Sequence, residues 1–174
     1  MSTPDHKSRA WHRLRALRRP QRPHAMKGER LRTYVELAAE PEEVFDLWLK
    51  LERLPEILEG VRRVKRVGDR RVLWDVDIAG RQLVWEAEIT DVQPGKRIAW
   101  ESRWGTPNRG ELHFERTAPG RTRIDVDIVY EPRGLLERMG AQLGLVRRSV
   151  EGDLLRFARF VRQVVDSERL RRVR

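Results

Sequence analysis

Paired acidic residues are the first candidates for chemistry in this sequence. Three pairs stand at alternate positions: Asp75 with Asp77, Glu86 with Glu88, and Asp125 with Asp127. Two neighbouring carboxyl groups could divide the roles of general acid and general base. Each pair, however, alternates with apolar residues, which places both carboxylates on the strand face turned away from the core. We therefore expect a solvated charge ladder on an outer face rather than a catalytic pair.

The sequence provides no set of histidines or cysteines that could form a metal site or a nucleophilic catalytic site. His6, His12 and His24 lie in a basic N-terminal segment, and His113 lies on the charged face of a predicted strand. The absence of cysteine excludes thiolate metal sites and disulfides, and agrees with a reducing compartment. No glycine-rich segment follows a strand in the pattern that binds phosphate. We expect no metal, no cofactor and no catalytic triad.

Aromatic residues are the most suggestive group. Trp74, Trp85, Trp100 and Trp104, four of the six tryptophans, fall at apolar positions of predicted strands. Flat aromatic walls suit a polycyclic, isoprenoid or quinone-like ligand, although large residues also simply fill a core. The residues that we expect to line a ligand pocket are Trp74, Trp85, Trp100, Ser102, Trp104, Phe114, Arg116, Tyr130, Met139 and Leu143.

Few of the residues predicted to face the pocket are polar. Ser102 and Tyr130 could orient a carbonyl or hydroxyl group of a ligand, because a buried polar group needs a partner. Arg116 continues the inward side of its strand but, near the strand end, can extend its charged group to solvent. Met139 and Leu143 would form the helix side of the cavity or its entrance.

Predicted strands must position these residues. From residue 61 to residue 130, apolar and polar residues alternate with a period of two. The predicted strands are 32–38, 61–67, 72–78, 83–89, 98–104, 112–114 and 122–130, with a loop at 105–108. Between the first two strands, Pro41 suits the first position of a short helix, and a second short helix ends at Gly60. Each strand is apolar on one face and charged on the other, which is typical of an antiparallel sheet covered on one side.

The segment from Gly134 to Asp166 is predicted to be the long final helix. Its apolar residues recur every three or four positions and form one stripe, with arginines between them, although Gly140, Gly144 and Gly152 could bend it. A helix this long with one apolar stripe needs an extended partner. We expect a curved antiparallel sheet of about seven strands wrapped around it.

The formal net charge of +10 is concentrated at the two ends. Residues 1–32 carry a net charge of +8, residues 167–174 carry +3, and residues 33–166 carry −1. We predict three parts: a basic, disordered arm at 1–30, one folded domain at 31–166 and a basic tail at 167–174. The arm could contact an anionic membrane surface, whereas the balanced domain argues against nucleic-acid binding. No export signal or membrane-spanning segment is evident, so we expect a cytoplasmic protein. Any contact with a membrane would be peripheral.

Several segments resemble one known group of proteins. They are Pro41–Trp48, Leu54–Val61, Trp85–Ile89, Asn108–Gly110 and Tyr130–Leu135. In the sequence of these segments and in the order of its predicted helices and strands, the chain resembles the START-like (SRPBCC) superfamily. Within that superfamily it resembles the polyketide cyclase/dehydrase and coenzyme Q-binding families. The resemblance covers about residues 32–165 and implies an α+β helix-grip (START-like, Bet v 1-like) fold with a cavity between sheet and C-terminal helix.

The resemblance and the residues together favour one function and leave two alternatives. We expect the chain to bind a small hydrophobic or amphipathic ligand, such as a lipid, quinone or polyketide, without catalysing a reaction. The first alternative is a polyketide-type cyclase/dehydrase acting in the same cavity, for which no residue matches a catalytic set. The second is association with a membrane or nucleic acid through the basic ends. The sequence does not indicate an oligomeric state.

Overall fold

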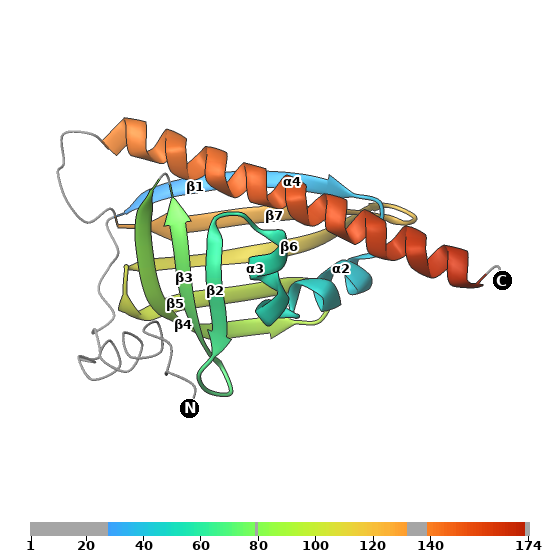
Figure 1. Ribbon diagram of the computed structural model, residues 1–174, viewed down its shortest axis with the longest axis horizontal. Helices are drawn as coiled ribbons and strands as arrows, with labels where there is room; N and C mark the ends of the chain where they lie inside the picture. The colour runs from blue at the N-terminus through green and yellow to red at the C-terminus, as the bar shows by residue number, and fades with distance from the viewer. Residues whose placement is uncertain (1–27, 79, 132–138, 173–174) are drawn as a thin grey trace, which may run out of the picture.

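The computed structural model describes residues 28–78, 80–131 and 139–172. Within these residues seven antiparallel strands form one curled sheet, in the order β1-β7-β6-β5-β4-β3-β2. The strands are β1 (Glu29–Leu37), β2 (Val61–Arg66), β3 (Arg71–Ile78), β4 (Arg81–Gln93), β5 (Arg97–Gly105), β6 (Asn108–Ala118) and β7 (Arg121–Tyr130). In Figure 1 the long helix α4 (Met139–Arg172) lies along the curled sheet beside β1. The expected helix-grip fold is confirmed.

Two short helices and a 3₁₀ turn connect β1 to β2. They are α2 (Pro41–Trp48), η1 (Leu51–Arg53) and α3 (Leu54–Ile57). Pro41 begins α2 as predicted, and the backbone N–H of Glu40 donates to Glu43 Oε2 at 3.2 Å, which closes the first turn. Glu40 Oε1 also accepts a hydrogen bond from the backbone N–H of Gly120 at 2.9 Å. This bond fixes the start of α2 against the turn between β6 and β7.

The connection between β5 and β6 is shorter than the loop predicted at 105–108. β5 continues to Gly105 and β6 begins at Asn108, so only Thr106 and Pro107 lie between the strands. Gly105 has a positive φ of 87°, and a β-carbon there would overlap the carbonyl oxygen of Val84. Glycine is therefore required at this corner for both conformation and space.

Both ends of the domain differ from the sequence prediction. β1 begins at Glu29 rather than Arg32, because Glu29 and Arg30 pair with Tyr130 and Val129 of β7. Helix α4 continues past Asp166 to Arg172, and no break interrupts it at its glycines. The arm predicted at 1–30 lies outside the described residues up to residue 27, and the segment 132–138 lies outside them too. No helix in the described part of the chain is both long enough and apolar enough to cross a membrane.

The apolar stripe of α4 has two different neighbours along its length. Leu154, Phe157, Val161 and Val165 are buried in the core, where Phe157 meets Trp48 of α2 edge to face at 4.9 Å between ring centroids. One to two turns earlier, Val146 and Val150 line a cavity, to which Leu154 also contributes. The core therefore fills one end of the space between sheet and helix and leaves the other end open to a ligand.

Candidate ligand-binding cavity

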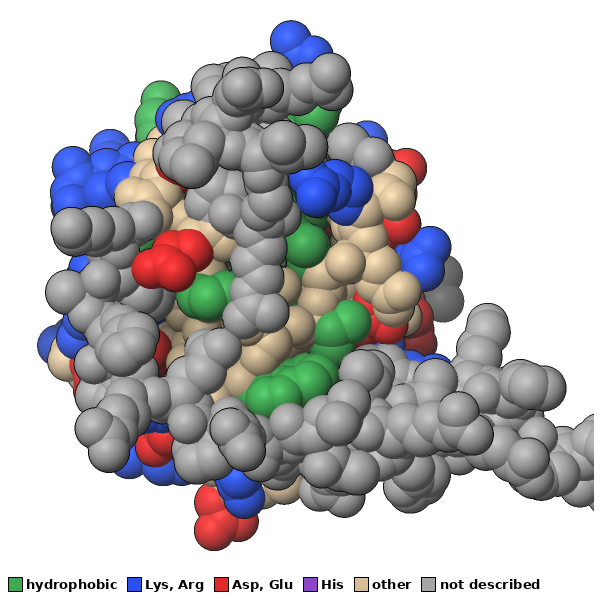
Figure 2. Space-filling model, turned by 90° about the vertical axis from the view of Figure 1, so that its left-hand side faces the viewer, with side chains coloured by type: hydrophobic (Ala, Val, Ile, Leu, Met, Phe, Trp, Pro, Cys, Tyr) green, Lys and Arg blue, Asp and Glu red, His purple; other side chains and the backbone are tan. Residues whose placement is uncertain are grey.

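A cavity of about 230 Å³ lies between the sheet and the first described part of α4. Strands β3 to β7, residues 58–61 and α4 all contribute to its walls, and nearly all of the lining side chains are apolar. Strand β7 ends at this side with Tyr130, which lines the cavity. Figure 2 views the molecule from this end and shows hydrophobic side chains gathered in a hollow among charged ones. An apolar hollow of this kind is the ordinary form of a small-molecule site.

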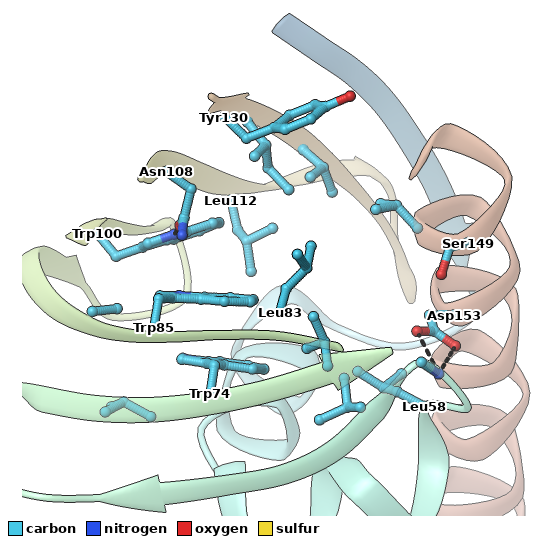
Figure 3. Close-up of a pocket in the computed structure, with 18 of the residues that line it drawn as sticks. Leu58, Trp74, Leu83, Trp85, Trp100, Asn108, Leu112, Tyr130, Ser149 and Asp153 are labelled. Carbon is cyan, nitrogen blue, oxygen red and sulfur yellow. Dashed lines mark hydrogen bonds between the residues drawn. The ribbon is translucent and has the colours of Figure 1, made fainter. Parts of the chain in front are cut away.

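Three indole rings form the sheet side of the cavity. Trp74 of β3 and Trp85 of β4 are direct cross-strand partners, and their rings stack with centroids 6.0 Å apart and planes 6° from parallel. Trp100 of β5 continues the series, so the three rings stand one above another in Figure 3. Trp85 Nε1 is buried and has no acceptor among the residues that the structure describes. The wall presents aromatic surface almost without polar groups.

Asn108 holds the upper end of this aromatic wall. Its side-chain Oδ1 accepts a hydrogen bond from Trp100 Nε1 at 3.0 Å, while its Nδ2 donates to the carbonyl oxygen of Thr106 at 2.9 Å. Its backbone N–H donates to Ser102 Oγ at 2.9 Å. Only 6% of Asn108 is exposed, so these bonds satisfy a buried amide and fix the orientation of the Trp100 ring.

Asp153 is the one ionisable carboxyl group on the cavity wall in the described part of the chain. It projects from α4 and accepts hydrogen bonds from the backbone N–H groups of Glu59, at 2.9 Å, and Gly60, at 3.3 Å. Burial raises the pKa of the Asp153 carboxyl to about 6, and the hydrogen bond from Gly60 opposes this shift. Figure 3 shows Asp153 and Ser149 on the helix side, across the cavity from the tryptophans. A carboxyl group with a raised pKa therefore lies across the cavity from the aromatic wall.

Residues 37–159 match the family described as "Polyketide cyclase / dehydrase and lipid transport". The match covers strands β2 to β7, the short helices and the part of α4 that lines the cavity. The chain belongs to this family. Its START-like fold agrees with the resemblance found in the sequence.

Solved structures share this fold. A Deinococcus radiodurans protein is 31% identical, covers 75% of this chain and 95% of its own, and has a TM-score of 0.57. An aromatase/cyclase from Streptomyces sp. R1128 and a START superfamily protein from Mycobacterium smegmatis are each 18% identical, with a TM-score of 0.68. Each covers 79% of this chain, with 95% and 99% of their own lengths matched. At that identity the two likenesses establish the fold of this family member and nothing about its activity.

Trp104 departs from the predicted inward set. The register between β4 and β5 shifts between Glu86 and Ala87, so Trp104 pairs with Glu86 while Trp85 pairs with Gly105. This irregularity moves Trp104 to the face opposite Trp85, because one extra residue in a strand reverses the alternation. Trp104 is accordingly absent from the cavity lining.

Three further residues predicted to line the cavity do not line it. Ser102 accepts the hydrogen bond from Asn108 and so acts behind the wall. Phe114 is 5% exposed in the core, where it meets Phe45 of α2 edge to face at 5.4 Å. Arg116 lies on the surface and forms ion pairs with Glu40 at 2.7 Å and Glu42 at 3.3 Å. The side chain of Arg116 therefore does not reach the cavity. It extends to solvent, which is the alternative that its position near the strand end left open.

Of the remaining predicted residues, Tyr130 lines the cavity, as do Trp74, Trp85 and Trp100. The Tyr130 hydroxyl donates a hydrogen bond to Glu29 Oε2 at 3.5 Å. Burial raises the pKa of Tyr130 to about 12, and the nearby Glu29 carboxylate adds to the shift. Met139 and Leu143 belong to the first turns of α4, whose side chains lie outside the described part. The predicted role of both residues therefore stays a prediction.

Sequence reasoning missed Asn108, Ser149 and Asp153. The sequence pattern predicts a loop at Asn108, although a lone amide after an aromatic strand is a usable signal for a buried hydrogen bond. Ser149 and Asp153 are four residues apart, so they share one helix face beside Val146 and Val150. Polar residues at the edge of an apolar helical stripe were the available signal for these two.

The paired carboxylates are not uniformly solvated. Asp75 is 7% exposed and accepts a hydrogen bond from Gln82 Nε2 at 2.9 Å. Glu86 is 3% exposed, with Leu73 and Trp104 as its direct partners in the flanking strands and Arg71 Nη1 at 3.4 Å. The prediction of a solvated ladder is wrong at these two positions, because bulky neighbours on the outer face cover the carboxylates.

Proposed function

We propose that this protein binds a small hydrophobic or amphipathic ligand with a flat ring system in the cavity, and that it sequesters or carries the ligand rather than converting it. The observation that carries the proposal is the wall of Trp74, Trp85 and Trp100 facing an otherwise apolar cavity. A quinone, a polyketide or a lipid with a ring fits this chemistry. The family description, which includes lipid transport, supports the same class.

Burial of apolar surface would drive binding. Each Å² of apolar area removed from water contributes about 25 cal/mol, and ring-on-ring contact adds about 0.5–1.5 kcal/mol. The stacked pair of Trp74 and Trp85 leaves little freedom to lose when a planar guest packs against it. The sheet side of the site is therefore ordered before a guest binds.

Native mass spectrometry of the purified full chain tests this proposal, followed by solvent extraction of any bound compound. We expect an apolar compound of ring-containing chemistry that leaves the protein unchanged. Titration calorimetry with β-naphthol provides a second measure that does not depend on the native ligand. Recovery of the bare chain alone, together with no heat of binding for β-naphthol, would contradict the proposal.

Catalysis as a polyketide-type cyclase/dehydrase is the second candidate, and one observation favours it. Asp153 lies on the cavity wall with its pKa raised to about 6, in the range where a carboxyl group can exchange protons near neutral pH. Incubation with a poly-β-ketone, with wild type compared to Asp153→Asn, tests this candidate. Product formed by wild type and lost in the variant would favour the enzyme, and unchanged substrate in both would leave binding alone.

A further inference from the structure

Three oxygen atoms converge on the space above Gly60. A β-carbon at Gly60 would stand 3.0 Å from Asp153 Oδ2, 3.2 Å from Ser149 Oγ and 3.3 Å from the carbonyl oxygen of Asp77. Gly60, Ser149 and Asp153 all line the cavity. Because glycine carries no side chain, no β-carbon at residue 60 covers these three oxygens. We call these residues, with the carbonyl of Asp77, the Gly60 niche.

The Gly60 niche can still accept hydrogen bonds. Asp153 Oδ1 accepts hydrogen bonds from the backbone N–H of Glu59 at 2.9 Å and from Arg156 Nη1 at 3.4 Å, whereas among the described residues Oδ2 accepts only from the backbone N–H of Gly60, at 3.3 Å. A carboxylate oxygen has two lone pairs, so Oδ2 can accept another donor. The hydroxyl of Ser149 has no hydrogen-bond partner among the residues that the structure describes.

The niche is the polar exception in its part of the cavity. Val146 and Val150 flank Ser149 on α4, and Leu58 and Val61 flank Gly60. An apolar guest without a polar group would leave the Asp153 carboxylate facing apolar surface, which is costly. A guest that donates a hydrogen bond would replace the water lost on binding.

We infer that the Gly60 niche recognises a hydroxyl group on the ligand, so that the ligand class is a hydroxylated ring compound whose ring lies against the tryptophan wall and whose O–H points to α4. This inference rests on the proposed function and names its ligand chemistry. The niche determines specificity, since the aromatic wall treats hydroxylated and unhydroxylated rings alike.

Two ligands that share one ring system test the inference. β-Naphthol donates a hydrogen bond, and its methyl ether has the same ring and oxygen but no O–H. Calorimetric titration of the full-length wild-type protein should give an affinity about tenfold higher for β-naphthol. Equal affinities for the two compounds would overturn the inference and leave the proposed function standing. Binding of neither compound would contradict the proposed function itself.

Variants separate recognition from structural support. In Asp153→Asn we expect the affinity ratio of the two compounds to fall to about twofold or less. In Gly60→Ala, whose new methyl group fills the niche while all three oxygens remain, we expect the same fall. Gly68→Ala, in the exposed turn between β2 and β3, is the matched control and should keep the wild-type ratio.

The ratio is informative even if a variant perturbs the fold. General damage to the cavity lowers the affinity for both compounds and leaves the affinity ratio unchanged. Loss of the hydrogen-bond acceptor lowers only the affinity for β-naphthol. If Asp153→Asn does not fold, Ser149→Ala removes one of the converging oxygens with a smaller change. A tenfold ratio that survives in every folded variant would assign the preference to another part of the cavity and overturn the inference.

Discussion

Trp74 and Trp85 stack across adjacent strands with their rings 6.0 Å apart and 6° from parallel. Their backbones are direct partners in the antiparallel pair of β3 and β4, so the sheet itself sets the ring spacing. Trp100 extends the series on β5, held by Asn108. The sheet therefore builds one face of the ligand cavity before any guest arrives.

Replacing Trp85 by alanine should weaken binding of β-naphthol about tenfold or more, because the central ring of the wall is lost. Calorimetric titration measures this effect. Trp104→Ala is the matched control, since Trp104 pairs with Glu86 on the opposite face of the sheet. An equal loss in both variants would show that stability, rather than contact with the guest, sets the affinity.

Asn108→Ala should destabilise the fold by about 1–3 kcal/mol, because Trp100 Nε1 and the carbonyl of Thr106 lose their partners. Urea denaturation measures the change in the free energy of unfolding. A double-mutant cycle with Trp100→Phe isolates the bond between the two side chains. Strictly additive effects of the two substitutions would mean that this hydrogen bond contributes nothing measurable.

Two glycine substitutions should have opposite effects. In Gly110→Ala the new methyl carbon would stand 2.6 Å from Trp100 Cζ2 and 2.9 Å from the carbonyl oxygen of Asp127, so we expect a loss of about 1–3 kcal/mol. In Gly144→Ala nothing lies within 4 Å, and α4 should gain up to about 1 kcal/mol. Thermal unfolding of the two variants compares them, and a stabilised Gly110→Ala would contradict the close packing behind Trp100.

The raised pKa of Asp153 predicts a specific pH dependence. Because burial raises this pKa from its ordinary value near 4 to about 6, the folded state holds the proton more tightly than the unfolded state. The contribution of this group to stability is therefore fully present below pH ~4 and is lost as the pH rises through about 6.

Asp153→Asn should remove that dependence. The melting temperature of the variant relative to wild type should rise between pH ~4 and about 6 and then stay level. Asp69→Asn, at an exposed turn position, serves as the control and should follow the wild-type profile. A constant difference between Asp153→Asn and wild type across this range would contradict burial of the carboxyl group.

The basic N-terminal arm predicts salt-sensitive binding to anionic vesicles. Residues 1–32 carry a net charge of +8, so deletion of residues 1–26 should greatly reduce sedimentation with phosphatidylserine vesicles at low salt. Vesicles of phosphatidylcholine alone are the control and should retain neither form. Equal retention of both forms on anionic vesicles would exclude a membrane role for the arm.

Much of the architecture follows from the sequence because its information is local. Period-two alternation predicted the strands, and the spacing of three and four predicted the final helix, since each period is a property of the backbone conformation. Glycines with positive φ occupy three of the corners between the predicted strands, at Gly80, Gly95 and Gly120. The same alternation placed Trp74, Trp85 and Trp100 on the inner face.

Only the tertiary structure decided the rest of the site. Trp104 left the inner face because the register shifts beside Glu86, and such a shift depends on a neighbouring strand rather than on the local pattern. Asp153 became a cavity residue because its helix meets the turn at Glu59 and Gly60, 93 or more positions earlier in the chain. A sequence displays which faces are apolar, but contacts between distant segments determine which polar groups are left facing the cavity, and those contacts form only when the sheet closes on the helix.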